Sequence, residues 1–236
     1  MKKIIFLCAI FFLCLCWSNI SSAFSKNVAS AAAFDAAQAD SSPVTVRKLP
    51  FKTAVIVYQY QGGQQGKEVV YIDVAKNRID QENEISVQAA GQTVSKKDRK
   101  MYDGKNFYEF IYKENMVIQY LKRKDAIDLL FQGKDIMENY QYAGASEVLG
   151  KKLKVYKSAM ELSGLWNGIE LKKKLINNPF GEQFNYVKTA IKITFDVPIP
   201  EEKFQVPVGM TILTEEQALK KTQEMFQALG NKIKRS

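Results

Sequence analysis

The feature that most constrains the fold is a long alternating segment near the C-terminal end, followed by two prolines. From Tyr186 to Val197 polar side chains alternate with apolar ones, and Thr189 is the one interruption on the apolar side. Alternation with a period of two predicts a β-strand with one buried and one solvent-facing side. Pro198 and Pro200 end this strand, because proline has no backbone N–H to donate to a sheet. The side chains predicted on its buried side are Val187, Ile191, Ile193, Phe195 and Val197.

Short strands separated by tight turns account for most of the chain before this segment. The connection Asp103-Gly104-Lys105-Asn106 is a strong hairpin signal, and similar turns recur between the other strands. Consecutive strands joined by such turns usually pair with one another, so the pattern predicts an antiparallel meander. Residues 78–88 and 92–102 are polar, which favours a sheet edge or a wet face. The predicted strands are 51–61, 67–74, 78–88, 92–102, 107–112, 116–122, 153–157, 160–166 and 169–176.

Two segments have helical rather than strand periodicity. Asp125–Tyr140 carries apolar residues three or four positions apart and is interrupted at Gly133, which predicts two short helices inserted between strands. Thr214 and Gln217 match a capping box, in which each side chain satisfies the backbone N–H of the other. The apolar stripe that begins at Leu219 then predicts a C-terminal amphipathic helix over 214–236, suited to packing on the sheet or lying on a membrane surface.

The N-terminal residues have the pattern of a secretory signal peptide. Lys2 and Lys3 precede an apolar run from Ile4 to Trp17, and small residues lead up to Ala23. We expect residues 1–23 to be the signal, with cleavage between Ala23 and Phe24; an uncleaved anchor is the alternative, although a spanning helix needs about 20 apolar residues. Residues 24–48 are rich in Ala and Ser and are predicted to form a flexible tether.

Composition excludes most catalytic and metal chemistry. The chain has no His, and its three cysteines, Cys8, Cys14 and Cys16, all lie in the predicted signal. A Ser-His-Asp triad, a Cys-His pair and a His or Cys metal site are therefore absent, so we expect no enzyme activity, no cofactor and no metal. The net charge is +9, but the lysines are scattered, which indicates a soluble surface or attraction to an anionic membrane surface. Nucleic acid is not expected as a partner of an exported protein.

Three segments carry a resemblance to a known family. They read VLGKKLKVY at 148–156, LWNGIEL at 165–171 and VPIPEEKFQVPVG at 197–209. The chain from Leu49 to Leu213 resembles the periplasmic outer-membrane lipoprotein carrier superfamily (LolA/LolB/RseB-like), and within it the uncharacterised DUF4412-like members. The resemblance implies a mainly β, α+β fold. In it, a curved antiparallel sheet forms an unclosed β-barrel, and helices cover the concave face and enclose an apolar cavity for acyl chains. It also implies a place in the periplasm of a Gram-negative-type bacterium.

Two functions follow from this reasoning. The first is an exported, non-enzymatic binding protein that shelters a lipid or an acylated lipoprotein in an apolar cavity. The second is a structural or sensory module of the cell envelope, with a packed core, that contacts an envelope protein or an anionic membrane surface. For any one apolar residue, an ordinary sheet core is the more frequent explanation. The candidates for the cavity lining are Val57, Ile72, Phe110, Ile118, Leu130, Phe131, Val187, Ile191, Ile193 and Phe195.

Overall fold

The computed structural model describes residues 49–89, 92–121, 126–179 and 181–233. The predicted signal, its cleavage between Ala23 and Phe24, and the tether at 24–48 lie outside these residues. In the part of the chain that is described, no helix combines the length and the apolar character needed to span a bilayer.

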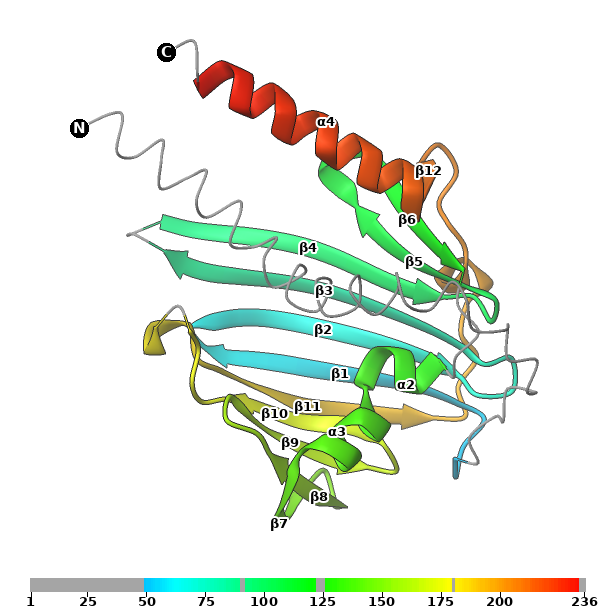
Figure 1. Ribbon diagram of the computed structural model, residues 1–236. Coiled ribbons are helices and arrows are strands. Elements are labelled where there is room, and N and C mark those ends of the chain that lie inside the picture. Colours follow the sequence, from blue (N-terminus) through cyan, green and yellow to red (C-terminus); the bar gives the residue numbers. More distant parts are fainter. Residues whose placement is uncertain (1–48, 90–91, 122–125, 180, 234–236) are drawn as a thin grey trace. The chain divides into compact units, whose positions relative to one another are not determined.

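Twelve strands form one sheet in the order β12-β6-β5-β4-β3-β2-β1-β11-β10-β9-β8-β7 (Figure 1). All neighbours pair antiparallel except β12 and β6, which are parallel. The end strands β12 and β7 do not pair with each other, so the sheet is not closed into a barrel. The predicted mainly β fold with an unclosed sheet, inserted helices and a C-terminal helix is therefore confirmed. The strands are β1 (Thr53–Gly62), β2 (Gln64–Asp73), β3 (Arg78–Ala89), β4 (Gln92–Tyr102), β5 (Asn106–Ile111), β6 (Met116–Leu121), β7 (Gln141–Val148), β8 (Lys151–Lys157), β9 (Glu161–Trp166), β10 (Ile169–Leu175), β11 (Tyr186–Phe195) and β12 (Thr211–Thr214).

Three strands show why alternation produces this sheet. Every second residue of β1, from Ala54 to Tyr60, is buried, and the residues between them are partly exposed. The register places Ile56 beside Val70 and Ala54 beside Ile72 on the same side of the sheet, and Ile72 in turn beside Ile79. These side chains form the main hydrophobic core. We call this side of the sheet the helix face, and the opposite side the tail face.

Two short helices cover part of the helix face. In α2 (Ala126–Phe131) the side chains of Ile127 and Phe131 are buried in the main core. Gln132, with a φ of 50°, ends α2 and begins α3 (Gly133–Asn139). The two predicted helices are confirmed, with the break one residue before Gly133. A glycine is needed at 133 because a Cβ there would lie 2.2 Å from the carbonyl oxygen of Gly168.

The chain then crosses the tail face and returns to the sheet. After β11, the proline-rich segment 198–210 contains the 3-10 turn η3 (Glu201–Phe204), whose Phe204 is buried. β12 adds to the edge of β6, and α4 (Glu215–Ile233) follows it at once. The capping box is confirmed: the Thr214 N–H donates to Gln217 Oε1 at 2.9 Å, and the Gln217 N–H donates to Thr214 Oγ1 at 3.3 Å.

Strand β11 differs from the regular alternation that its sequence suggests. Tyr58 lies beside Ala190 whereas Val57 lies beside Lys192, so Ile191 is an extra, bulged residue and is 48% exposed. Such a bulge changes which positions face each side. Before it, the buried Lys188 and Ala190 lie on the helix face; after it, Ile193 and Phe195 do. The prediction of one continuous buried face through Val187 and Ile191 is therefore wrong.

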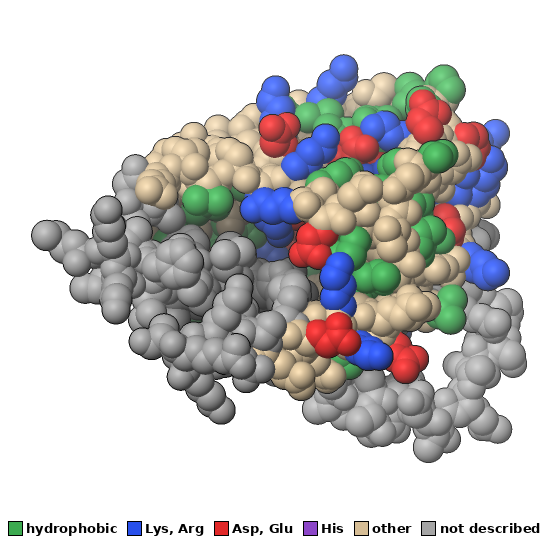
Figure 2. Space-filling view, turned by 90° about the horizontal axis from the view of Figure 1, so that it is seen from above, with side chains coloured by type: hydrophobic (Ala, Val, Ile, Leu, Met, Phe, Trp, Pro, Cys, Tyr) green, Lys and Arg blue, Asp and Glu red, His purple; other side chains and the backbone are tan. Residues whose placement is uncertain are grey.

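Other strand assignments also change. β3 and β4 are internal strands of the sheet, so the edge predicted as one alternative is wrong. The other alternative, a wet face, holds for β4, where residues 92–97 are exposed. No strand was predicted for residues 141–146, which form most of the edge strand β7. β12 was not predicted either. On the surface shown in Figure 2, basic side chains are interspersed with acidic ones rather than gathered in one area.

Candidate ligand-binding site

The predicted lining residues do not share one surface. Ile72, Phe131, Ile193 and Phe195 belong to or pack against the main core on the helix face, and Leu130 is partly buried against it. Ile118 lies on the helix face farther along the sheet, on β6. Val57 and Phe110 lie on the tail face, as does Val187, which neighbours the helix-face residue Lys188. Ile191 is the exposed bulge residue. The structure therefore brings together about half of the predicted set.

Beneath α2 the helix face is filled by protein side chains. Ile72 and Phe131 are 1% and 4% exposed, and both belong to the same core cluster as Ile56 and Ile127. Large apolar side chains in such a cluster fill the interior rather than line an empty space. A ligand on this face is therefore expected beside α2, not underneath it.

Farther along the sheet, partly exposed apolar side chains lie between α2 and α4. We define the central strip as the helix-face residues Asn83, Ile85, Val87, Phe107 and Ile118, all of them partly exposed. In Figure 1 the strands that carry them run between α2 on one side and α4 on the other. An ion pair links α4 to this end of the sheet: Lys221 Nζ is 3.4 Å from Glu114 Oε2, in the turn before β6.

The charged side chains beside the central strip are paired with one another. Lys96 contacts Asp98 at 2.8 Å, and Lys100 contacts Glu109 at 3.5 Å. These pairs lie on the helix face of β4 and β5. The register places these pairs between the apolar side chains of β3 and those of β5 and β6. The strip thus has an apolar part on β3 and another on β5 and β6, and the charges between them are neutralised by pairing.

A buried polar cluster lies on the same face next to the strip. Lys188 Nζ on β11 is 3.0 Å from Glu170 Oε1 on β10 and 3.6 Å from Glu68 Oε1 on β2. Tyr60 donates its hydroxyl to Glu68 Oε2 at 2.6 Å, and Ser163 donates to Glu170 Oε2 at 2.9 Å. All five side chains are buried. Sequence reasoning missed this cluster; the available signal was Glu68, which precedes Val70 and Ile72 on the apolar side of an alternating strand.

The charges of this cluster determine how its members titrate. Burial alone would lower the pKa of Lys188, but the Glu68 and Glu170 carboxylates raise it well above its ordinary value. Burial would raise the pKa of Glu170, yet Lys188 and Lys173 hold it below its ordinary value. Burial also raises the pKa of the Tyr60 hydroxyl, which stays a hydrogen-bond donor. These directions keep Glu170 ionised, Lys188 charged and Tyr60 neutral.

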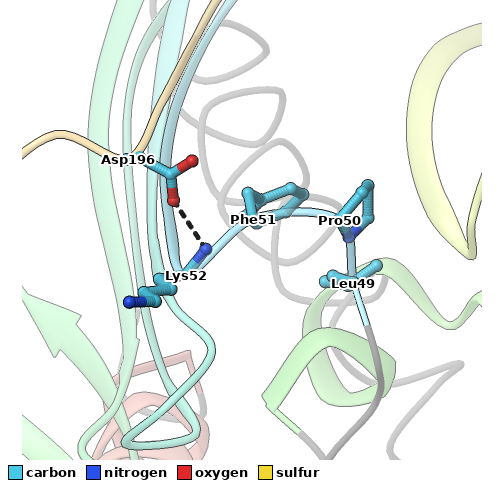
Figure 3. Close-up of a pocket in the computed structure, with 5 residues that line it drawn as sticks. All are labelled: Leu49, Pro50, Phe51, Lys52 and Asp196. Atoms are coloured by element: carbon cyan, nitrogen blue, oxygen red, sulfur yellow. Dashed lines mark hydrogen bonds between the residues drawn. The ribbon is translucent and has the colours of Figure 1, made fainter.

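An open cavity of about 570 Å³ lies at the start of β1 (Figure 3). It is lined by Leu49, Pro50, Phe51, Lys52 and Asp196. The Lys52 N–H donates to Asp196 Oδ1 at 2.8 Å. The Phe51 ring stacks on Phe195 with centroids 5.0 Å apart, so one predicted lining residue supports a wall of this cavity.

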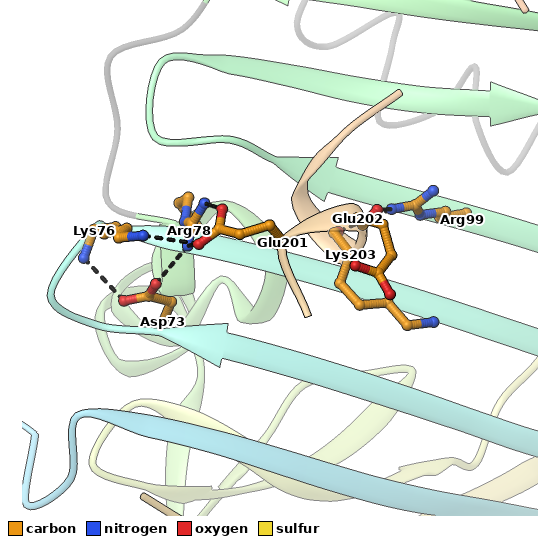
Figure 4. Close-up of polar contacts among 7 residues, drawn as sticks. All are labelled: Asp73, Lys76, Arg78, Arg99, Glu201, Glu202 and Lys203. Carbon is orange, nitrogen blue, oxygen red and sulfur yellow. Dashed lines mark hydrogen bonds and ion pairs between the residues drawn. The ribbon is translucent and has the colours of Figure 1, made fainter. Parts of the chain in front are cut away.

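Ion pairs hold the proline-rich segment on the tail face (Figure 4). Arg78 donates to Glu201 Oε2 at 2.6 Å and to Asp73 Oδ2 at 2.7 Å, and its guanidinium lies 4.2 Å from the centre of the Phe204 ring. Arg99 donates to the Lys203 carbonyl at 2.8 Å and to the buried Asp80 at 2.7 Å. The segment read as a family signature thus serves here to cover the tail face.

The fold is that of an open antiparallel sheet with short helices on one face and an extended segment on the other. No family model matches the chain, so the narrower prediction of a DUF4412-like protein is not supported. No curated protein matches it either.

Solved structures that resemble the chain do so at low sequence identity. An uncharacterized conserved protein from Thermus thermophilus has a TM-score of 0.47 and 8% identity, over 72% of this chain and 94% of that one. MucB has a TM-score of 0.37 and 11% identity, over 71% of this chain and 61% of that one. PNGF-II has a TM-score of 0.36 and 10% identity, over 74% of this chain and 32% of that one. Likenesses at this level do not assign a function.

Proposed function

We propose that this protein is an exported, non-enzymatic binding protein that holds an acyl chain of a lipid or acylated protein on the central strip, between α2 and α4. The observation that carries the proposal is the set of partly exposed apolar side chains on the strip, between which the charged side chains are paired with one another. Covering apolar surface stabilises a complex by about 25 cal/mol per Å² removed from water, and needs few polar contacts.

The helices beside the strip provide a means of release. α2 and α3 have six and seven residues and meet at Gln132, so they form a small unit. Its buried side chains are Ala126, Ile127, Phe131 and Ile136. Movement of this unit would expose or cover one side of the strip, and a partner with higher affinity for the acyl chain would shift the equilibrium towards release.

The test measures ligands directly. The full chain is purified gently after export and analysed by native mass spectrometry, and displacement of a bound fluorescent fatty acid is then titrated. We expect co-purifying lipid masses and saturable displacement. Ile85→Asp on the strip should weaken binding at least tenfold, whereas Ser86→Asp, its partly exposed neighbour on the tail face, should leave binding unchanged. Absence of lipid masses together with absence of fatty-acid binding would rule the proposal out.

A second function is favoured by the outer edge of β7. This strand pairs with β8 alone among the described strands, and most of its side chains are exposed, including Tyr142 at 58%. An exposed edge can pair with an extended segment of another protein. If the protein acts as an interaction module, Ala145→Pro in β7 should abolish partner binding. Fatty-acid binding should stay at its original level.

A further inference from the structure

The buried cluster beside the central strip has an acceptor with no donor. Glu68 is fully buried, and its Oε1 accepts no hydrogen bond from the described residues; Lys188 Nζ stands 3.6 Å away. The other oxygen of the same carboxylate is occupied by the Tyr60 hydroxyl at 2.6 Å. Buried carboxylate oxygens are normally hydrogen-bonded, because leaving one without a donor destabilises the folded protein.

A second acceptor without a donor lies directly beside the first. Asn83 on β3 pairs in register with Glu68 on β2, so both side chains project from the helix face at adjacent positions. Side chains directly opposite in an antiparallel pair have Cβ atoms about 4.5–5.5 Å apart. Asn83 Oδ1 is buried and also lacks a donor among the described residues, although the residue as a whole is partly exposed on the central strip. Two acceptors without a donor thus belong to side chains at adjacent register positions on one face, at the edge of the strip.

Around this site there are more acidic groups than basic groups. The charged groups of the cluster and its neighbours are the carboxylates Glu68, Glu170 and Glu161 and the ammonium groups Lys188 and Lys173, with Lys173 Nζ 2.6 Å from Glu161 Oε2. On β4, Asp98 lies opposite Asn83 and pairs with Lys96 at 2.8 Å. Tyr58, Tyr60, Tyr140 and Tyr186 complete the surroundings and are neutral, because burial raises the pKa of each hydroxyl. These four acidic and three basic groups leave one formal negative charge without a partner, in a setting where charges are normally paired.

We propose that Glu68 and Asn83 bind a primary ammonium group of the ligand whose acyl chain lies on the central strip. An ammonium group has three N–H donors and no acceptor, so one such group donates to both oxygens and supplies the missing positive charge. A hydroxyl group brings no charge, a quaternary ammonium brings no N–H, and a carboxylate or phosphate meets the negative cluster unfavourably. This inference rests on the proposed function and adds the chemistry of the ligand's polar end.

The test compares probes that share a twelve-carbon chain and differ in the polar group. Dodecylammonium, dodecyltrimethylammonium, dodecanol and laurate are titrated below their micellar concentrations against the full-length protein. We expect dodecylammonium to bind at least tenfold more tightly than the trimethyl analogue and laurate. Equal binding of all four probes overturns the ammonium site and leaves the proposed function intact, whereas binding of none overturns both.

Variants connect the preference to the two residues. Glu68→Gln should remove the preference for dodecylammonium while dodecanol binds as before, and Asn83→Ala, at a partly exposed position that tolerates substitution, should reduce the preference. Glu84→Gln removes the same charge from an exposed position next to Asn83 and should change nothing. A preference that survives both Glu68→Gln and Asn83→Ala overturns the assignment.

Two further experiments identify the kind of molecule that carries the ammonium group. Ethylammonium has the group without the chain, and vesicles of ethanolamine lipid present it on a membrane lipid, with choline-lipid vesicles as the comparison. Weak competition by ethylammonium together with extraction of the ethanolamine lipid supports a lipid headgroup. Competition by ethylammonium equal to that of dodecylammonium supports the site with a soluble amine as its ligand.

Discussion

At the scale of single residues, the tail face contains a buried ion pair, Asp80–Arg99, in which burial and the guanidinium have opposite effects on the pKa of the carboxyl group. Asp80 is fully buried on β3 and accepts from Arg99 Nε at 2.7 Å, while its second oxygen has no donor among the described residues. Burial raises the pKa of Asp80 from 3.8 to about 7, which exceeds the opposing effect of Arg99. Desolvation of this carboxylate therefore outweighs its attraction to one guanidinium.

This pKa predicts how stability depends on pH. Between about pH 4 and about pH 7, the folded protein keeps a proton on Asp80 that the unfolded chain has released. The free energy of unfolding should therefore contain a contribution that decreases as pH rises through this window. Asp80→Asn should remove that contribution, whereas Asp98→Asn, at a partly exposed position, should keep it. Urea unfolding at pH 5 and pH 7.5 measures the difference, and identical pH dependence of Asp80→Asn and the unsubstituted protein would contradict it.

The bulge in β11 provides a second test at single residues. Ile191 is 48% exposed at the bulge, whereas Ile193 packs against the main core. Ile191→Asp should change the free energy of unfolding by no more than about 0.5 kcal/mol. Ile193→Asp should cost several times more, because it places a carboxylate against apolar side chains. Chemical denaturation of both variants checks this, and similar losses would show that Ile191 is buried.

At the scale of elements, each face of the sheet is covered differently. α2 and α3 cover part of the helix face with apolar side chains, while segment 198–210 covers the tail face with ion pairs and Phe204. A second small core of Met101, Tyr108, Phe110 and Val117 lies under Val206 and Met210 of this segment. The tail segment therefore shields apolar surface as well as joining β11 to β12.

The contribution of that segment is measurable. Phe204 is 4% exposed, so Phe204→Ala should lower the free energy of unfolding by about 3–5 kcal/mol through lost burial and the cavity left behind. Val208 in the same segment is fully exposed, and Val208→Ala should have almost no effect. Both values come from urea titrations monitored by circular dichroism; equal effects would mean that the segment does not pack on the sheet.

At the scale of the whole molecule, alternation and turn chemistry were sufficient to predict the meander. β1 to β6 follow the predicted segments because each strand pairs with the next one along the chain. The helical segment and the capping box were also predictable, since each depends on residues a few positions apart. β7 and β12 were not, because Gln141–Ser146 has no alternation and β12 is a four-residue strand that gains its place by pairing with β6.

The candidate site was less predictable than the fold. The sequence indicated which side chains are apolar. The prediction placed Val57 and Phe110 on the same surface as Ile72, whereas the register places Val57 and Phe110 on the tail face and Ile72 on the helix face. The Glu68–Lys188–Glu170 cluster joins a residue of β2 to residues of β10 and β11, which are far from β2 in the chain. No local pattern connects charges whose proximity depends on the order of strands in the sheet.

What the sequence determined by itself is therefore everything that depends on near neighbours along the chain: the strands of the meander, the turns between them and the capped C-terminal helix. Tertiary structure alone decided which face each side chain occupies after the bulge at Ile191, which segment covers which face, and which charges meet. The physical reason is that periodicity records whether a residue alternates, while its partners and its surroundings are determined by strand order and register.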